Sequence, residues 1–118
     1  MPKRVLIIED DPSLGQTMLE MLEMLGFHPK LSSGFRIAQA ILEDDRNWDA
    51  IISDFSLGDG KGSDIMRFCL GDPELKDCVQ IITSGYERAA QQAFLEGLDN
   101  VHWLVKPYPI AKLVELIK

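Results

Sequence analysis

The sequence predicts an α/β domain built on a doubly wound parallel sheet of five strands. Two observations predict it. Short apolar runs typical of buried strands alternate with segments whose apolar residues recur at helical spacing, and these runs are followed by polar or charged residues. Strands that alternate with helices pair in parallel through right-handed crossovers, which cover both faces of the sheet. Ligands of such sheets bind outside the carboxyl ends of the strands, so the residues at those ends are the candidates for function.

The first half of the chain supplies three of the strands. RVLII (4–8) is an uninterrupted apolar run, and WDAIISD (48–54) is a second buried strand that ends in a carboxylate. HPKLSS (28–33) is a weaker strand, which we expect at the edge of the sheet because proline cannot donate a ladder hydrogen bond. Helices are predicted over 12–26 and 35–45, the first with an apolar face made of Leu14, Met18, Met21, Leu22 and Leu25.

The second half continues the alternation. SDIMRFCLG (63–71) predicts a helix, and VQIITS (79–84) predicts a buried strand that ends before Gly85. ERAAQQAFLEGL (87–98) predicts the fourth helix. VHWLV (101–105) predicts the fifth strand, and PIAKLVELIK (109–118) predicts the final helix.

Length and composition narrow the class of protein. A chain of 118 residues suits one compact domain, over residues 1–118. A net charge of −7 argues against a surface for nucleic acid or for anionic membrane, because both need clustered Lys and Arg. The apolar runs are too short for a membrane span or a signal peptide, which predicts a cytoplasmic location. Cys69 and Cys78 lack the spacing of a metal site or a disulfide framework, so we interpret both as structural thiols.

Polar residues gather at the carboxyl ends of the predicted strands. Three acids follow the first strand, one ends the third, a serine ends the fourth and a lysine follows the fifth: Glu9, Asp10, Asp11, Asp54, Ser84 and Lys106. Carboxylates brought together repel one another unless a cation lies between them, and oxygen ligands of this kind suit Mg²⁺. In such a site Asp54 would be a carboxylate nucleophile, while Lys106 and Ser84 would contact phosphoryl oxygens.

Simpler roles are open for some of these residues. Asp11 also fits a helix N-cap, with Pro12 at the first helical position. Ser84 also fits a cap of the segment that follows it, and Trp103 fits ordinary packing. Asp59, within GDG, is typical of a turn.

Four motifs occur in order at the predicted strand ends: LIIEDDP, IISDFSLGDGKGSDIM, IITSGY and LVKPY. With them the chain resembles, over essentially its whole length, the receiver domains of two-component response regulators. The resemblance implies a flavodoxin-like (βα)5 fold of the CheY-like type with strand order 2-1-3-4-5. It further implies a single receiver domain, which either stands alone or belongs to a longer regulator or hybrid kinase.

The resemblance assigns a metal site and a phosphoacceptor. Glu9 and Asp10 match the family's acidic pair, and Asp54 matches the phosphorylated aspartate, which also binds Mg²⁺. The backbone carbonyl of Ser56 matches a further metal ligand, and Asp11 is a possible addition to the set. Gly58 stands where many receivers have proline, which should loosen this loop.

The resemblance also assigns the residues that respond to phosphorylation. Ser84 matches the hydroxyl residue that approaches the phosphoryl group, although a shift of one residue would give this role to Thr83. Lys106 matches the family's lysine, followed by a cis bond to Pro107. Trp103 occupies the aromatic switch position and is bulkier than the usual Tyr or Phe.

The resulting function is that of a signalling switch rather than an enzyme. Asp54 would take a phosphoryl group from a histidine kinase or histidine phosphotransfer protein, with Mg²⁺ as cofactor. The domain would catalyse its own phosphotransfer and dephosphorylation. The face of the fourth helix, fifth strand and fifth helix would then control an unknown output domain or target protein, or form a homodimer. The alternatives are a degenerate module that works without phosphate and an aspartate-nucleophile phosphohydrolase, which would usually want an acid at the position of Ser56.

Overall fold

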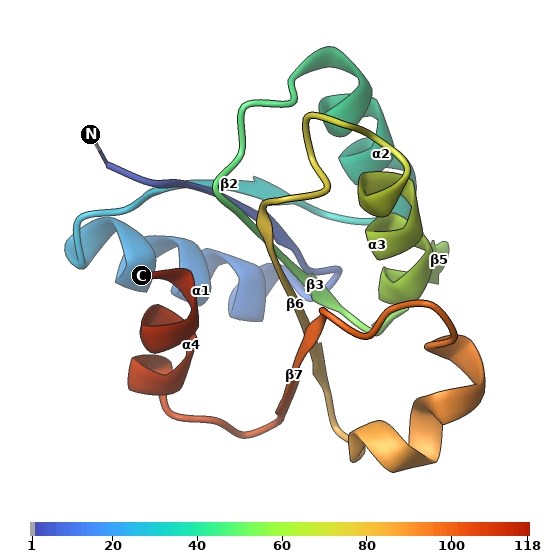
Figure 1. The fold of residues 1–118 in the computed structure, drawn as a ribbon. Coiled ribbons are helices and arrows are strands. Elements are labelled where there is room, and N and C mark those ends of the chain that lie inside the picture. The colour runs from blue at the N-terminus through green and yellow to red at the C-terminus, as the bar shows by residue number, and fades with distance from the viewer. Residues whose placement is uncertain (1) are drawn as a thin grey trace.

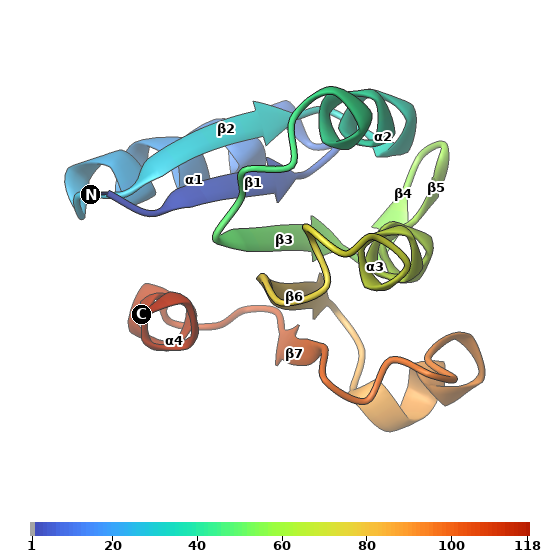
Figure 2. The same cartoon turned by 45° about the horizontal axis from the view of Figure 1, so that its top comes forward.

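The protein is described by a computed structural model that covers residues 2–118. One parallel sheet forms its centre, and Figure 2 shows the strands following one another across it. In spatial order these strands are β2 (His28–Ser32), β1 (Arg4–Ile8), β3 (Ala50–Asp54), β6 (Val79–Ser84) and β7 (His102–Val105). This is the predicted order 2-1-3-4-5, since the two intervening strands belong to a separate hairpin. β2 lies at an edge, as its proline predicts.

Helices cover both faces of the sheet (Figure 1). On one face lie α1 (Pro12–Met24) and α4 (Ile110–Ile117), whose Leu22, Leu113 and Ile117 pack with the side chains of alternate strand residues. On the other lie α2 (Phe35–Asp44) and α3 (Gly62–Leu70), packed against the opposite set of strand residues. This two-sided burial explains why the central strands are uniformly apolar and not alternating.

The segment predicted as a helix over 87–98 folds differently. It forms a 3₁₀-helix, η1 (Arg88–Phe94), in which no residue is buried; the burial comes afterwards, at Leu95 and Leu98. Most of its apolar side chains are short alanines, which bury too little surface to hold a longer α-helix against the sheet. Arg88 instead fixes the segment, donating hydrogen bonds to the carbonyls of Leu98 (2.9 Å) and Val101 (2.7 Å).

The apolar face predicted for α1 is only partly covered. Leu22 is fully buried and Met18 and Met21 are half-buried, whereas Leu14 and Leu25 are 50% and 52% exposed. Packing therefore uses a narrower stripe than the helical periodicity indicates. The remainder of the apolar face is exposed to solvent.

A small hairpin that the sequence did not predict follows β3. It consists of β4 (Ser56–Leu57) and β5 (Gly60–Lys61), paired antiparallel. Gly58 and Asp59 form its turn. The hairpin closes where the amide of Gly62 donates to the carbonyl of Phe55 over 2.8 Å.

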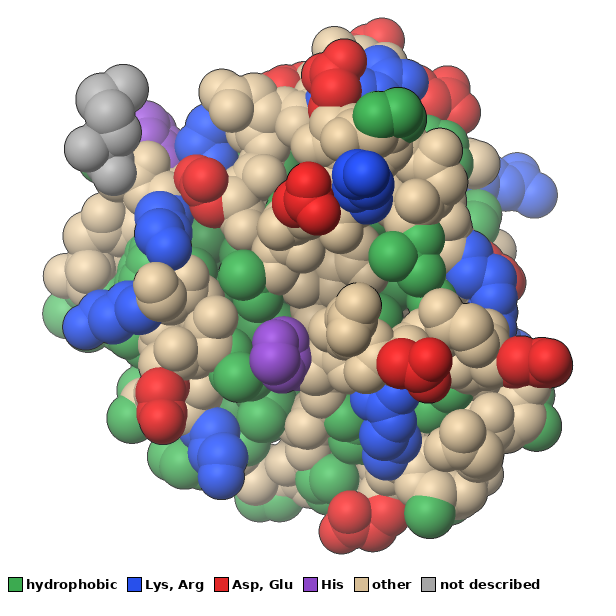
Figure 3. All heavy atoms as spheres, viewed as in Figure 1, with side chains coloured by type: hydrophobic (Ala, Val, Ile, Leu, Met, Phe, Trp, Pro, Cys, Tyr) green, Lys and Arg blue, Asp and Glu red, His purple; other side chains and the backbone are tan. Residues whose placement is uncertain are grey.

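Three further features complete the description. Cys69 and Cys78 are both free thiols, and burial raises the pKa of Cys69 to about 12 and that of Cys78 to about 11. Both are therefore unreactive at neutral pH. Among the described residues, none of the helices is both long and apolar enough to cross a membrane. On the face shown in Figure 3, basic side chains are interspersed with acidic ones.

Candidate functional site

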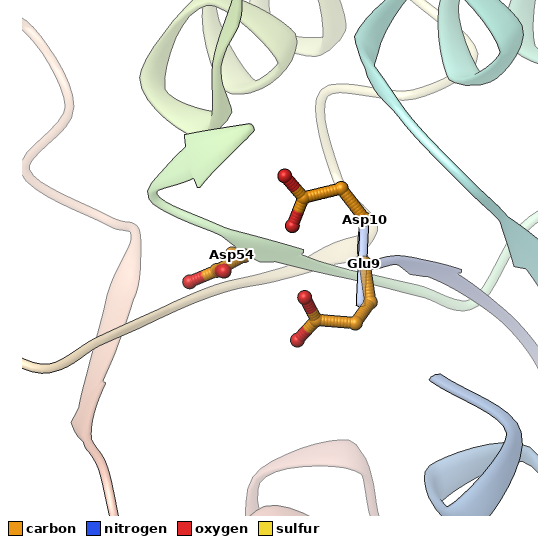
Figure 4. Close-up of side chains that lie close together, drawn as sticks. All are labelled: Glu9, Asp10 and Asp54. Carbon is orange, nitrogen blue, oxygen red and sulfur yellow. The ribbon is translucent and has the colours of Figure 1, made fainter. Parts of the chain in front are cut away.

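Three carboxylates meet at the carboxyl edge of the sheet. Glu9 and Asp10 directly follow β1, and Asp54 is the last residue of the neighbouring β3. Each offers an oxygen, and these oxygens all lie within 4.8 Å of one another. Figure 4 shows the side chains leaving the two strand ends toward a common space. The structure thus brings together three of the residues expected to bind a metal.

The alternation of side chains along the strands determines how the acids are presented. Val5 and Ile7 face α1 and α4, so Glu9 continues that face while Asp10 turns to the other. Glu9 is only 5% exposed, and its Oε2 accepts a hydrogen bond from the amide of Asp11 over 3.2 Å. Asp10 is exposed, and its Oδ2 accepts from the amide of Gly58 over 2.9 Å.

Lys106 supplies the positive charge of the site. Its Nζ lies 3.3 Å from Oδ1 of Asp54 and 3.4 Å from Oε1 of Glu9. The residue is positioned by its own backbone, because its amide donates to the carbonyl of Ser84 over 2.7 Å. The peptide bond between Lys106 and Pro107 is cis, as expected.

The carboxylates outnumber the ammonium, and their pKa values reflect this. Burial, reinforced by the neighbouring Asp54, raises the pKa of Glu9. Burial also raises the pKa of Asp54, against the opposing effect of Lys106. Burial alone would lower the pKa of Lys106, but the charges of Asp54 and Glu9 outweigh it and raise the pKa. An excess of clustered oxygen donors over positive charge is the donor chemistry that suits a hard divalent cation.

Asp11 is not one of the three clustered carboxylates. Oδ1 of Asp11 accepts hydrogen bonds from the amides of Ser13 (2.9 Å) and Leu14 (3.2 Å), so this side chain caps α1. Its carboxylate is thus occupied by the simpler of the two roles open to it. Ser56 is exposed and begins β4, paired with Lys61 across the hairpin.

The two candidate hydroxyls lie on opposite faces of β6. Thr83 pairs in register with Asp54, and both it and Ser84 are buried. Ser84 Oγ accepts a hydrogen bond from the amide of Tyr86 over 3.1 Å, in the turn before η1, whose N-cap residue Glu87 makes no side-chain cap. Alternation places Ser84 on the same face as Ile82 and Trp103, which pair with each other across β6 and β7.

Trp103 is half-buried beside the residue that follows the phosphoacceptor candidate. Its ring centroid lies 5.6 Å from that of Phe55, which in turn contacts Phe94 edge-on at 5.6 Å. The indole Nε1 donates to the carbonyl of Tyr86 over 2.9 Å. Trp103 therefore belongs to an aromatic cluster with Phe55 and Phe94, and this cluster is involved whether Trp103 acts in packing or as a switch.

An apolar groove of about 500 Å³ opens beside Glu9 and Lys106. α1 contributes Met18 and Met21 to it, and Tyr108 closes the side toward α4. Burial raises the pKa of Tyr108 to about 12, with the charges of Glu9 and Asp54 adding to the shift. The groove joins Leu14, which α1 leaves exposed, to Glu9 and Lys106 of the charged site.

Sequence reasoning missed two residues that support the site. Asp59 was expected to be only a turn residue, but its carboxylate accepts the amides of Phe35 (2.7 Å) and Arg36 (3.0 Å) at the start of α2. Gly62 begins α3 so close to β3 that an added Cβ would lie 2.5 Å from the carbonyl oxygen of Asp54. A glycine at the start of a predicted helix could have indicated close packing against a strand. A cap that comes from a distant hairpin leaves no signal in the sequence around the helix it caps.

Comparisons with known proteins identify the fold. No protein-family model matches the chain, and no curated protein matches its sequence. Solved structures do match. The chemotaxis response regulator CheY4 of Vibrio cholerae is 20% identical, with a TM-score of 0.88 and full coverage of both chains.

Two further structures share the fold. The signal receiver domain of a histidine kinase from Syntrophus aciditrophicus is 23% identical with a TM-score of 0.86, covering 98% of this chain and 86% of that one. The response regulator TrrA of Thermotoga maritima, solved in complex with Mg²⁺ and BeF, is 20% identical with a TM-score of 0.81, covering 96% and 94%. The chain has the fold of CheY-like response regulator receiver domains.

Proposed function

We propose that this chain is a receiver domain that accepts a phosphoryl group on Asp54 from the phosphohistidine of a histidine kinase or phosphotransfer protein. The observation that carries the proposal is the position of Asp54, at a strand end between the ammonium of Lys106 and the carboxylates of Glu9 and Asp10. The fold shared with receiver domains supports it, including the likeness to a receiver domain from a histidine kinase.

The transfer would be an in-line displacement. A carboxylate oxygen of Asp54 attacks phosphorus, and the bond from phosphorus to the imidazole nitrogen breaks with the electron pair staying on that nitrogen. The other ring nitrogen of the phosphohistidine carries a proton, so the histidine leaves as a neutral imidazole. The protein would contribute position and charge: Lys106, whose Nζ lies 3.3 Å from Oδ1 of Asp54, would pair with a phosphoryl oxygen. The hydroxyl of Ser84, or of Thr83, would donate to another oxygen of the product.

Glu9, Asp10 and Asp54, with the backbone carbonyl of Ser56, would hold Mg²⁺. When bound, Mg²⁺ neutralises the repulsion among the carboxylates and the phosphoryl oxygens and orients the latter. The donor set fits, because three carboxylate oxygens converge within 4.8 Å. A structural neighbour solved in complex with Mg²⁺ and BeF supports Mg²⁺ as the cation.

The output would be conformational. In this structure Trp103 is held by the carbonyl of Tyr86 and by contact with Phe55. Movement of Ser84 toward a phosphorylated Asp54 would shift the residues on the same face of the sheet. The indole of Trp103 would then lose its contacts with Tyr86 and Phe55. The surface of η1, β7 and α4 would then change its affinity for an output domain or target protein.

The partner that donates phosphate would dock beside α1. The exposed apolar residue Leu14 and the groove lined by Met18 and Met21 lie next to Glu9 and Lys106. Apolar side chains of a partner helix seated there would bring its phosphohistidine to Asp54.

Intact mass spectrometry after incubation with acetyl phosphate tests the proposal. We expect one added phosphoryl group, dependent on Mg²⁺, in the wild type and in Asp44→Asn, a matched substitution at an exposed aspartate of α2. Asp54→Asn should gain none. No adduct in the wild type, with phosphoramidate also tried, would favour a phosphate-independent module. Continuous release of phosphate from a monoester would favour a phosphohydrolase.

A further inference from the structure

The hairpin after β3 is too small to fix its own position. Each of its strands has two residues, and its turn contains Asp59 between Gly58 and Gly60. Two-residue strands form too few ladder hydrogen bonds to offset the conformational freedom of a glycine-flanked turn. Contacts outside the hairpin must therefore hold it.

Asp59 makes the first of these contacts. Its Oδ1 accepts the amide of Phe35 over 2.7 Å, and its Oδ2 accepts the amide of Arg36 over 3.0 Å. The residue in the N-cap position of α2, Gly34, offers no side chain for this purpose. Asp59 thus supplies from the hairpin the acceptor that a local Ser or Asp usually provides. These two hydrogen bonds, first from Arg36 and then from Phe35, hold the pKa of Asp59 below its usual value.

The surrounding packing shows a close fit between turn and helix. A Cβ added to Gly60 would lie 2.6 Å from the ring of Phe35. One added to Gly34 would lie 3.0 Å from Oδ1 of Asp59. The turn and the first residues of α2 therefore meet closely: Gly60 has no room for a side chain, and a Cβ at Gly34 would press on the carboxylate of Asp59.

The other side of the same turn contacts the carboxylate cluster. The amide of Gly58, the residue before Asp59, donates to Oδ2 of Asp10 over 2.9 Å. Two successive residues thus join the N-terminus of α2 to an acid of the candidate metal site. Ser56, whose carbonyl is a candidate ligand, lies in the first strand of this hairpin.

We propose that Asp59 is a positioning residue for the metal site: by anchoring the turn to α2 it holds Asp10 and Ser56 where they bind Mg²⁺. This inference rests on the proposed function, since it concerns the same site. Asp59 itself points to α2 and does not contact the cluster. A role confined to capping α2 would change stability and leave metal affinity as it is.

Mg²⁺ titrations, followed by calorimetry on the wild type and three variants, separate the two roles. Asp59→Ala removes both acceptor oxygens, and Asp59→Asn keeps one. Asp72→Ala is the matched control, because Asp72 accepts the amide of Glu74 over 2.9 Å and pairs with Arg46, in the loop after α3 at the opposite end of the sheet. Urea unfolding of each variant confirms that it is folded during the titration.

We expect the Mg²⁺ dissociation constant of Asp59→Ala to rise about tenfold, the scale of effect of residues that orient metal ligands. Asp59→Asn should lie between Asp59→Ala and the wild type, and Asp72→Ala should bind as the wild type does while losing stability. In amide hydrogen exchange, Gly58 should lose protection in Asp59→Ala, lose less of it in Asp59→Asn and keep it in Asp72→Ala. Wild-type affinity in folded Asp59→Ala, or full protection of its Gly58 amide, would overturn the inference. A wild type that binds no Mg²⁺ would instead overturn the proposed function.

Discussion

The ammonium of Lys106 lies 3.3 Å from Oδ1 of Asp54 and bridges to Glu9 at 3.4 Å, so one cation serves two desolvated carboxylates. The side chains of Glu9 and Asp54 are 5% and 17% exposed, and that of Lys106 is 29% exposed. Little water is available to replace the ammonium if it is removed. The ion pair between Lys106 and Asp54 therefore joins the loop after β7 to the end of β3. The ammonium also offsets part of the negative charge of the site.

Lys106→Met should lower the free energy of unfolding at pH 7 by about 1 kcal/mol, allowing for the solvent that still reaches the ammonium. The physical reason is that Glu9 and Asp54 would be left to repel each other. Urea denaturation measures the effect, with Lys112→Met as a control at an exposed lysine of α4. Equal stability of the two variants would show that the ion pairs contribute nothing.

The raised pKa values of Glu9 and Asp54 predict how stability depends on pH without divalent cations. A carboxyl whose folded pKa lies above its unfolded value binds protons more tightly in the folded state. Its contribution to stability is complete below the unfolded pKa and is lost as pH rises through the folded pKa. Asp54→Asn removes this loss, so it should gain stability relative to the wild type as pH rises from 4 to 7. A difference that stays constant over this range would contradict the predicted shift for Asp54.

Gly62→Ala should destabilise the protein by about 1–3 kcal/mol, the usual cost of forcing an atom into packed structure. The new Cβ would lie 2.5 Å from the carbonyl oxygen of Asp54 and 2.9 Å from Oγ of Ser53, which would push α3 away from β3. Gly85→Ala is the matched control, since nothing lies within 4 Å of its added Cβ. Thermal unfolding of both variants measures the difference, and equal melting temperatures would contradict the close approach.

Fluorescence tests the involvement of Trp103 in switching. Trp48 has to be replaced first; it lies near the opposite end of the sheet, with its Nε1 bonded to the carbonyl of Asp45 over 2.8 Å. In Trp48→Phe, adding Mg²⁺ and beryllofluoride should change the emission of Trp103, because its indole would leave the carbonyl of Tyr86. Unchanged emission, with Mg²⁺ binding shown separately, would leave Trp103 as a packing residue.

Much of the fold could be predicted because burial on both faces of a sheet requires strands that are apolar along their whole length. RVLII, WDAIISD and VQIITS became β1, β3 and β6, and parallel pairing then brought Glu9, Asp10 and Asp54 to one edge. An apolar sequence pattern indicates which strands are buried. In a parallel sheet the carboxyl ends of those strands lie side by side, so the residues that follow them become neighbours.

The missed features depend on contacts between distant segments. The cap that Asp59 provides for α2 and the close approach of Gly62 to Asp54 join segments that are far apart in sequence or in different elements. The prediction of a helix over 87–98, where the structure has the shorter η1, was wrong because helical periodicity does not reveal how little surface alanines bury. Two-residue strands such as β4 are also below the length at which alternation can be recognised.

Chemical trapping of the phosphorylated residue tests the central claim most directly. The protein is phosphorylated with acetyl phosphate and Mg²⁺, reduced with borohydride, digested and analysed by peptide mass spectrometry. An aspartyl phosphate is reduced to homoserine, and we predict this conversion at residue 54 alone. Homoserine at Asp10, reduction of Glu9 to 2-amino-5-hydroxypentanoic acid, or a phosphate on Ser84 that survives reduction would contradict the assignment of Asp54 as the phosphoacceptor.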